Sequence, residues 1–509
     1  MSATTESIAL IGTEARLVEV EVSVSGGMPG CAIVGLPARS VKEAEQRTRS
    51  AMETSGFRWP HRRIVANLAP GALRKEGTHF DLALALGILS EEEHVDDSAL
   101  EGYVAIGELA LDGAVRPVRG ALAAAIGAHQ AGRKGLICPA GNAPEAALVS
   151  GLDVVPVSTL KDCIAWVQRT WEPSPVETRA DLSGPSVEDM REVRGHPTAK
   201  RALEIAAAGG HNLLLIGPPG SGKTMLARRL PGILPRMSLE ESLEVTRIHS
   251  VAGLLIERAA LVTTRPFRVP HHNITVAGLI GGGSGVARPG EVSLAHNGSL
   301  FLDELGLYRP SVLDSLRAPL EDGTVRIARS GGSIAYPCRF ALIAAMNPCP
   351  CGYLGDGPRA CRCSGHQLQL YNARLSGPLL DRFDMQVSMA RLTKRELLGQ
   401  PEGETSATIR GRVERGRAVQ VERYGSPVTT NSSARKAELD AALRPSVDAH
   451  RALEGAIDAL MLSGRGVDRV LRVARTIADL EGEPEIGDEH LNEALMFRAQ
   501  VQEAASCLG

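Results

Sequence analysis

Residues 217–224 read Gly-Pro-Pro-Gly-Ser-Gly-Lys-Thr, and this stretch decides the fold of the chain around it. It matches the phosphate-binding loop pattern G-x-x-x-x-G-K-[ST] at every fixed position. The glycines allow a tight turn whose backbone N–H groups point at phosphates, and the helix that follows adds its positive end. Lys223 is expected to reach the β- and γ-phosphates, and the Thr224 hydroxyl to ligate Mg²⁺. The predicted nucleotide-binding residues are Gly217, Pro218, Pro219, Gly220, Ser221, Gly222, Lys223 and Thr224.

The segments on either side of the loop fit the same interpretation. Residues 211–216 (His-Asn-Leu-Leu-Leu-Ile) are typical of a short buried strand, and residues 225–230 (Met-Leu-Ala-Arg-Arg-Leu) of a helix. Strand, loop and helix in this order are the context that the motif requires. We therefore expect the chain to bind ATP together with Mg²⁺.

Composition limits the remaining possibilities. The chain has 509 residues, which is enough for about three domains. Its formal net charge of −3 gives no overall attraction to nucleic acid, so any DNA contact needs a local basic surface. The polar start lacks the basic residues of a signal peptide, and no apolar run reaches the roughly 18 to 20 residues of a membrane span. The sequence predicts a cytoplasmic protein without a membrane partner.

Three regions with different patterns are visible along the chain. Residues 1–170 mix short strands with helices, and residues 171–188 hold several prolines without an apolar period, which is typical of a linker. Residues 189–392 alternate strands and helices around the phosphate loop, which predicts an α/β domain with a parallel sheet. Residues 393–509 carry apolar residues at helical spacing and are expected to form a C-terminal helical lid.

Two further strands complete the expected ATPase site. Residues 299–304 (Ser-Leu-Phe-Leu-Asp-Glu) read as a buried strand that ends in two acids. Asp303 is expected to orient Mg²⁺, and Glu304 to act as the base that polarises the attacking water. The strand at 339–346 ends at Asn347, whose amide can position that water near the γ-phosphate.

Two arginines are candidates for sensing the γ-phosphate. Arg382, in the string Leu-Leu-Asp-Arg-Phe-Asp at 379–384, can reach the nucleotide of a neighbouring subunit and stabilise transition-state charge. Arg472 lies on a helical stretch of the C-terminal region and is expected to bend back over the nucleotide. Arg469 and Arg475 compete with it within one turn.

The order of these motifs resembles that of the AAA+ ATPases. Local strings at 270–272 (Pro-His-His), 279–283 (Leu-Ile-Gly-Gly-Gly), 289–296 (Pro-Gly-Glu-Val-Ser-Leu-Ala-His) and 376–382 (Ser-Gly-Pro-Leu-Leu-Asp-Arg) are similar to the magnesium-chelatase-like branch, and specifically to the YifB/ComM family. The resemblance covers essentially the whole chain. It implies a homo-oligomeric, hexameric ring in which the arginine finger acts between subunits, and ComM-type members are understood as DNA helicases that drive branch migration during natural transformation. We expect such a DNA motor, with an ATP-dependent protein remodeller or a metal-chelatase-type motor subunit as the alternative.

This branch of the AAA+ ATPases carries extra hairpins that point into the pore of the ring. Residues 323–336 show strand alternation around a glycine-rich turn, which predicts such a hairpin. Its residues Arg326 and Arg329 can face a phosphate backbone, or they can form an ordinary solvated face. His271 and His272 lie in an insertion before the acidic strand, where packing or a subunit contact competes with a metal role.

Four of the nine cysteines form a cluster with the pattern C-x-C, nine residues, C-x-C. Four thiolates this close together suit a tetrahedral structural Zn²⁺. Free thiols, or His366 as a ligand in place of one cysteine, are the alternatives. The cluster consists of Cys349, Cys351, Cys361 and Cys363, and the remaining cysteines (Cys31, Cys138, Cys163, Cys338 and Cys507) are typical of small buried residues.

The N-terminal region resembles the Lon-type protease domain in the strings at 75–81, 117–122 and 135–139. That family uses a Ser-Lys dyad. Here His79 stands at the position of the serine and Leu122 at that of the lysine. Without a hydroxyl nucleophile and its amine base there is no acyl-enzyme route, so we expect an oligomerisation or substrate-guiding layer rather than a peptidase.

Overall fold

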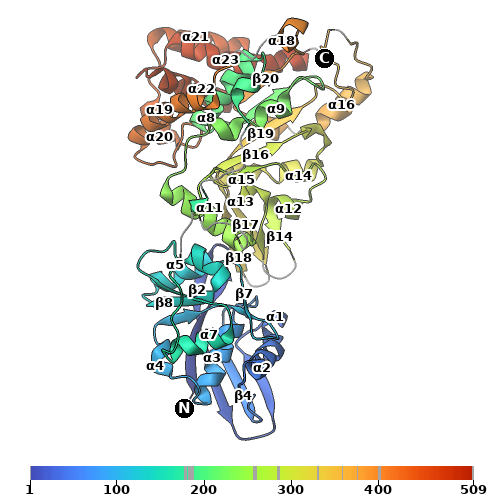
Figure 1. Cartoon of the computed structure of the whole chain (residues 1–509). Helices are drawn as coiled ribbons and strands as arrows, with labels where there is room; N and C mark the ends of the chain where they lie inside the picture. Colours follow the sequence, from blue (N-terminus) through green and yellow to red (C-terminus); the bar gives the residue numbers. More distant parts are fainter. Residues whose placement is uncertain are drawn as a thin grey trace.

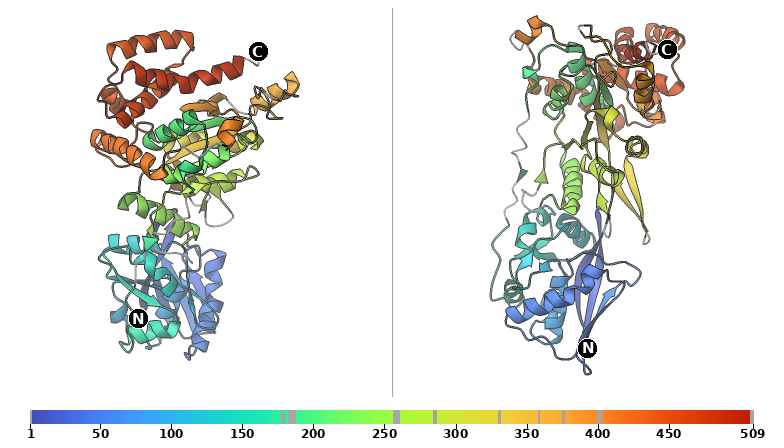
Figure 2. Two further views of the ribbon diagram at one scale, coloured as in Figure 1. Left: turned by 45° about the horizontal axis from the view of Figure 1, so that its top comes forward. Right: turned by 90° about the vertical axis from the view of Figure 1, so that its right-hand side faces the viewer.

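The computed structural model describes residues 2–176, 180–181, 188–255, 261–283, 287–329, 332–357, 359–374, 377–398 and 403–506. The molecule is elongated, with the N-terminal unit at one end, the sheet that carries the phosphate loop in the middle and the C-terminal helices at the other end (Figures 1 and 2). Half of the predicted linker at 171–188, namely 177–179 and 182–187, lies outside the described residues. None of the described helices combines the length and apolar character that crossing a membrane requires.

The N-terminal unit is built on a seven-stranded mixed sheet with the order β3-β4-β2-β1-β5-β8-β9. The apolar run 82–89 is fully buried within helix α3. This helix lies between the sheet and helix α2, and both present apolar side chains to it. The strands are β1 (Ala3–Ile11), β2 (Glu14–Ser25), β3 (Gly30–Val34), β4 (Arg63–Ala69), β5 (Tyr103–Ala105), β8 (Gly135–Pro139) and β9 (Asp153–Val157), with β6 (Glu108–Leu109) and β7 (Val115–Arg116) as a separate pair. The helices are α1 (Arg39–Lys42), α2 (Ala44–Thr54), α3 (Asp81–Glu91), α4 (Asp97–Leu100), α5 (Ala121–Gln130), α6 (Ala143–Ala146) and α7 (Leu160–Val167).

The central unit holds a five-stranded sheet with the order β13-β16-β19-β11-β20, in which all neighbours are parallel. This confirms the predicted mixed α/β core. Leu213 and Leu215 face one hydrophobic core and Leu214 faces another, so helices cover the sheet on both sides. The strands are β11 (Leu213–Ile216), β13 (Phe267–Arg268), β16 (Gly298–Leu302), β19 (Phe340–Met346) and β20 (Met385–Ser388).

Short helices and small hairpins surround this sheet. The helices of the central unit are α8 (Pro197–Gly209), α9 (Lys223–Ala227), α10 (Leu230–Ile233), α11 (Leu239–Ala252), α12 (Val276–Ile280), α13 (Glu291–Leu294), α14 (Pro310–Asp314), α15 (Arg317–Asp322), α16 (Gly365–Ala373) and α17 (Gly377–Leu380). The predicted hairpin at 323–336 is present as β17 (Thr324–Arg329) paired with β18 (Gly332–Pro337). Two further pairs are β14 (Gly281–Gly282) with β15 (Arg288–Pro289), and β10 (Ala180–Asp181) with β12 (Leu261–Val262).

The described part of the C-terminal region is helical, as its apolar spacing predicts. Helix α22 is amphipathic, and its residues Val470, Val473 and Ile477 pack into the same core as α8 and β11. The helices are α18 (Lys394–Leu398), α19 (Ser406–Tyr424), α20 (Lys436–Ala442), α21 (Val447–Ala459), α22 (Gly464–Glu481) and α23 (Asp488–Ser506).

The N-terminal and central units meet along α5 and α11. The amide of Gly120 donates to the carbonyl of Ser250 over 3.1 Å, and Val251, Ala123 and Tyr336 form a small buried cluster at the junction. Gly12, in the turn between β1 and β2, lies so close to Ile334 of β18 that a Cβ at this position would be 2.9 Å from that side chain. The hairpin β17–β18 therefore packs its apolar face on the N-terminal unit (Figure 1).

Candidate functional site

The parallel sheet brings three sequence motifs to one edge. The phosphate loop follows β11, Asp303 follows β16 and Asn347 follows β19, and these three strands are neighbours in the sheet. Because the carboxyl ends of parallel strands share one edge, their polar tips converge. Motifs spread over residues 217–347 thus form one site.

Two contacts join the loop to the other strand tips. Thr224 Oγ1 donates to Asp303 Oδ2 over 2.8 Å. Lys223 Nζ lies 3.2 Å from Asn347 Oδ1, and it also donates to the carbonyls of Gly217 and Pro218 over 2.6 and 2.9 Å. A hydroxyl paired with a carboxylate, next to an ammonium paired with an amide, is suited to hold a Mg²⁺–triphosphate.

Burial and nearby acids shift the pKa of Lys223 in opposite directions. The side chain is almost completely buried, and this desolvation lowers its pKa, while the charges of Asp303 and Glu304 oppose the shift. Backbone carbonyls take the place of a counter-ion around the ammonium group. A triphosphate in the loop would supply the missing negative charge directly.

Two of the loop glycines have backbone conformations that favour glycine. Gly220 has φ of 80° and Gly222 has φ of 87°, in the left-handed region. Gly217 is required for space instead, since a Cβ there would lie 2.3 Å from the carbonyl oxygen of Met389. The loop pattern is thus explained by both backbone conformation and close packing.

Glu304 lies at the rim of the site and has an unusual backbone. Its φ of 52° is positive, and its amide donates to Asp303 Oδ1 over 2.9 Å. Its side chain is 56% exposed, and its Oε2 lies 3.8 Å from Nδ1 of His272. The sequence does not predict the contact between His272 and Glu304, although the Pro-His-His string singles this histidine out.

Tyr308 and the two histidines form a small aromatic group beside Glu304. The rings of His271 and His272 lie 4.1 Å apart, and the Tyr308 hydroxyl donates to the carbonyl of Pro270 over 2.6 Å. Burial, together with the charges of Asp303 and Glu304, raises the pKa of Tyr308, so its hydroxyl remains protonated. The group fixes the backbone that presents His272 to Glu304.

Arg382 lies at the opposite edge of the sheet. Its carbonyl accepts a hydrogen bond from the side chain of Asn212, which precedes β11, whereas the phosphate loop follows β11. Its guanidinium pairs with Glu321 and donates to the carbonyl of Pro378, and its buried Nε has no partner among the described residues. The structure therefore does not bring Arg382 to the phosphate loop of its own chain.

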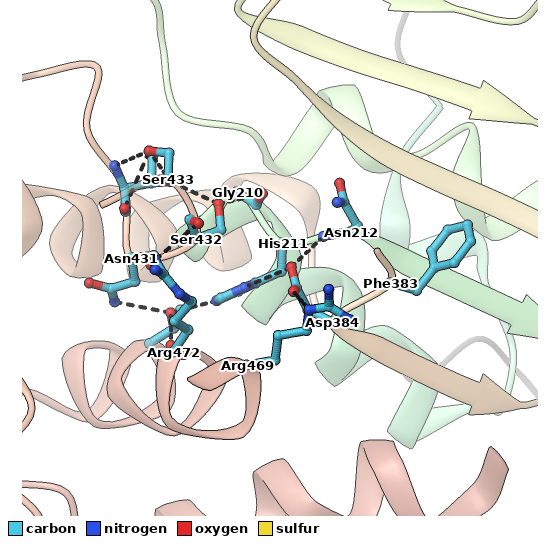
Figure 3. Close-up of polar contacts among 12 residues, drawn as sticks. Gly210, His211, Asn212, Phe383, Asp384, Asn431, Ser432, Ser433, Arg469 and Arg472 are labelled. Carbon is cyan, nitrogen blue, oxygen red and sulfur yellow. Dashed lines mark hydrogen bonds and ion pairs between the residues drawn. The ribbon is translucent and has the colours of Figure 1, made fainter. Parts of the chain in front are cut away.

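Arg472 lies beside Asn431 and Ser432 (Figure 3). Its Nη1 donates to the carbonyls of Asn431, Ser432 and Ala434 over 2.7 to 3.1 Å. Together with Arg382 it lines a cavity of about 930 Å³ that includes residues at the amino end of β11. The structure does not place it over the phosphate loop of the same chain.

Arg469 and Arg475, the alternatives to Arg472, differ in their surroundings. Arg475 is fully buried and pairs with Asp479 over 3.0 Å, which gives it a structural role. Arg469 lines the cavity and lies 3.6 Å from Asp384 (Figure 3). His211 connects that aspartate to α22, since its ring nitrogens lie 3.3 Å from Asp384 Oδ2 and 2.7 Å from the Thr476 hydroxyl.

Of the two hairpin arginines predicted to contact DNA, the structure describes the side chain of only one. Arg326 is exposed on β17, opposite Ala335 of β18, on the face that points away from Val325 and Ile327. The side chain of Arg329 lies outside the described residues. The hairpin therefore offers one described cation to solvent.

The four cysteines at 349, 351, 361 and 363 come together as the sequence pattern suggests. Their sulfur atoms all lie within 4.8 Å of one another, and three of the separations are 3.4, 3.6 and 3.7 Å. A tetrahedral Zn²⁺ with bonds of about 2.3 Å needs sulfur atoms about 3.8 Å apart. Backbone N–H groups of Arg362 and Tyr353 lower the pKa of Cys351, whereas burial raises the pKa of Cys349 and Cys363, so the fit to a metal rests on the positions of the sulfur atoms. The donor set thus fits zinc.

His79 and Leu122 of the N-terminal unit are both buried. Leu122 lies in the apolar face of α5, and burial lowers the pKa of His79 to about 4. The Nε2 atom of His79 has no hydrogen-bond partner among the described residues. No hydroxyl nucleophile takes the place of the serine at this position.

Three family models cover most of the chain. Residues 189–397 match "Magnesium chelatase, subunit ChlI", residues 20–142 match "Subunit ChlI of Mg-chelatase", and residues 403–498 match "Magnesium chelatase, subunit ChlI C-terminal". The chain is also 45% identical to a protein of Mycobacterium tuberculosis over 493 residues, which are 97% of each chain. It is 44% identical over 504 residues to the competence protein ComM of Haemophilus influenzae, at 97% of each chain, and 41% identical over 496 residues to the protein YifB of Escherichia coli, at 96% of each chain.

Proposed function

The chain belongs to the magnesium-chelatase-like YifB/ComM family of AAA+ ATPases, and on this premise we propose that it is an ATP-hydrolysing ring motor that acts on DNA. Its activity would be that of a helicase that promotes branch migration in recombination and natural transformation. The observation that carries the ATPase part is the contact of Thr224 with Asp303 beside the phosphate loop. Similarity over nearly the full length to a competence protein supports the DNA part.

In this proposal the loop residues bind the phosphates of ATP, and Thr224 and Asp303 hold Mg²⁺, which neutralises phosphate charge when it is bound. Lys223 exchanges its contacts with loop carbonyls for the β- and γ-phosphates. Glu304 polarises the attacking water and Asn347 orients it. The 3.8 Å contact with His272 holds the Glu304 carboxylate at the rim of the site.

The site is completed between subunits. Arg382 lies at the far edge of the sheet, so it acts on the nucleotide of the neighbouring subunit in a hexameric ring. Arg472 lines the same cavity and is assigned to the same subunit interface, with the C-terminal helices serving as the lid. The buried Nε of Arg382, which has no partner among the described residues, supports a role toward an anion.

Outside the ATPase site, Arg326 and Arg329 of the hairpin contact the DNA backbone in this proposal, and the cysteine cluster holds a structural Zn²⁺. The cluster begins two residues after Asn347, so the metal would fix the chain that leads from this residue to α16. The N-terminal unit is a Lon-like layer without the Ser-Lys dyad. It guides DNA rather than cleaving peptides.

The test is strand displacement on a three-stranded, fluorescently labelled DNA with Mg²⁺ and ATP. The wild type is expected to release the labelled strand, while Lys223→Ala and Glu304→Gln abolish release. Arg58→Ser, which removes an exposed charge of the N-terminal unit, serves as the matched control and is expected to act like the wild type. ATP hydrolysis without any DNA stimulation or strand release would reject the DNA motor and favour a remodeller or chelatase-type motor.

A further inference from the structure

Asn212 stands directly before β11, the strand whose other end carries the phosphate loop. In the sheet β11 lies between β19 and β20, and the side-chain amide of Asn212 reaches toward both. Its Oδ1 accepts from the amide of Leu342 in β19 over 2.8 Å, and its Nδ2 donates to the carbonyl of Arg382, just before β20, over 2.9 Å. The side chain thus adds one rung of hydrogen bonds to the sheet beyond the start of β11.

The main chain of Asn212 contacts the same turn. Its carbonyl accepts from the amides of Asp384 and Met385 over 3.0 and 3.2 Å. Its amide donates to Asp384 Oδ2 over 3.1 Å (Figure 3). Together with the side-chain contact, four hydrogen bonds join this one residue to the segment 382–385. The position of Arg382 therefore depends on Asn212.

The remaining contacts of the turn are enough to keep it folded. The amide of Arg382 donates to the carbonyl of Leu379 over 2.8 Å, and the ring of Phe383 is fully buried. Among the described residues, however, only the Asn212 side chain donates to the Arg382 carbonyl. Loss of this donor would leave a carbonyl without its partner and let the turn shift, without removing the apolar packing that holds it in the core.

The guanidinium of Arg382 is held less firmly than its backbone. It pairs with Glu321, whose side chain is 55% exposed, and it donates to the carbonyl of Pro378. Arg382 and Asn212 line the same cavity of about 930 Å³. An arginine that acts on another subunit needs a fixed backbone and a side chain that can exchange its contacts, because the reacting groups tolerate little displacement.

Asp384 also connects this turn to the C-terminal helices. Its Oδ2 lies 3.3 Å from Nδ1 of His211 (Figure 3), and the Nε2 atom of that histidine lies 2.7 Å from the hydroxyl of Thr476 in α22. The Thr476 hydroxyl donates to the carbonyl of Arg472 over 3.0 Å. The turn of Arg382 and the helix of Arg472 thus belong to one network, which starts from the two residues before β11.

We propose that Asn212 is a positioning residue for Arg382, which it holds where the guanidinium can reach the nucleotide of the neighbouring subunit. The inference rests on the proposed ring motor, and it adds to the shared site a residue from outside the ATPase motifs. Asparagine is disfavoured in strands, so the start of a buried strand gives no reason of its own for this residue. Each subunit would use β11 twice, with one end at its own nucleotide and the other end supporting the arginine for its neighbour.

The test measures phosphate release by the full chain with Asn212→Ala. We expect kcat to fall by up to about 100-fold, as when a catalytic group is displaced by about 1 Å, and KM for ATP to stay unchanged because the phosphate loop is intact. An equal mixture with Lys223→Ala should, after exchange of subunits, rise to about one quarter of the wild-type rate, since Lys223→Ala subunits supply a well-placed Arg382. A mixture with Arg382→Ala should show no rise, because neither variant supplies one.

Two further variants separate positioning from a general loss of structure. Asn142 of the N-terminal unit is also buried, and its amide bonds to both backbone groups of Val118 over 2.8 and 2.9 Å. The matched control Asn142→Ala should fall to about half of its own rate when mixed equally with Lys223→Ala, because half of the phosphate loops are then inactive. Asn212→Asp keeps the acceptor for Leu342 but removes the donor to Arg382, so it should repeat the pattern of Asn212→Ala, and it carries the test if melting curves show that the alanine variant unfolds.

The mixtures distinguish this inference from the proposed function. If Lys223→Ala and Arg382→Ala do not restore each other, the site is not shared between subunits, and both the ring mechanism and the role of Asn212 are wrong. If they do restore each other, but the Asn212 variants keep their kcat, or are restored by Arg382→Ala or by neither partner, the ring mechanism stands and Asn212 does not position Arg382.

Discussion

The position of Arg382 makes a quantitative prediction for mixed rings. The arginine lies at the amino edge of the sheet and the phosphate loop at the carboxyl edge, so one chain cannot bring both to the same nucleotide. Lys223→Ala should inactivate the site of its own subunit, and Arg382→Ala the site of its neighbour. Each variant alone is expected to lose at least about 10³-fold in ATP hydrolysis, which is the usual effect of removing an arginine finger.

An equal mixture of the two variants should regain activity. A site is intact when a subunit with a normal Lys223 borrows a normal Arg382 from the next subunit around the ring. With random assembly, each condition holds for half of the subunits, so about one quarter of the interfaces are intact. We expect the mixture, after exchange of subunits, to hydrolyse ATP at about one quarter of the wild-type rate, as measured by phosphate release.

The rate of ATP hydrolysis should also depend on the mixing ratio in a defined way. Because the intact fraction is the product of the two subunit fractions, the rate should follow a parabola with its maximum at equal amounts. A mixture of Lys223→Ala with the double variant Lys223→Ala/Arg382→Ala has no intact site and serves as the control. If no ratio of the two single variants exceeds their separate rates, Arg382 does not act across subunits as the structure suggests.

Three other changes test separate parts of the molecule. Thr224→Val keeps the side-chain shape but removes the hydroxyl that contacts Asp303, so the Mg²⁺ concentration at half-maximal ATP hydrolysis should rise about tenfold or more; an unchanged Mg²⁺ titration would argue against metal binding there. Metal analysis of the purified protein should find about one zinc per chain, which Cys349→Ser removes; wild-type protein free of zinc would reject the site. Hydrogen bonding from His296 lowers the pKa of Glu244 from 4.5 to about 2, and because solvent screens this partly exposed carboxylate, Glu244→Gln should reduce the free energy of unfolding at pH 7 by on the order of 1 kcal/mol. This contribution is present above pH 4.5 and is lost as the pH falls toward 2, so denaturation curves of variant and wild type should converge there, and a constant difference would contradict the assignment.

The sequence predicts the part of the site that local patterns encode. The phosphate loop, Asp303 and Asn347 each end an apolar strand, and in a parallel sheet strand ends meet at one edge. To predict that these residues converge, it is therefore enough to assign the strands correctly. The hairpin at 323–336 is confirmed for the same reason, since its alternation and turn are local properties.

Contacts between distant segments could not be predicted in this way. His272 reaches Glu304 through the path of the chain after β13, and no spacing rule connects the two residues. The sequence predicts the helix that carries Arg472, but the direction of this helix relative to the sheet depends on its packing against α8 and β11. Such packing is decided by the summed shape of many apolar side chains, which a motif does not contain.

Helix α11 offers a physical route from the ATPase sheet to the N-terminal unit. At its middle, Glu244 accepts hydrogen bonds from His296, Asn297 and Arg339, which precede β16 and β19. At its end, the carbonyl of Ser250 accepts from the amide of Gly120. Because both anchors are on one helix, we expect a displacement of β16 or β19 to reach the junction with the N-terminal unit at Gly120.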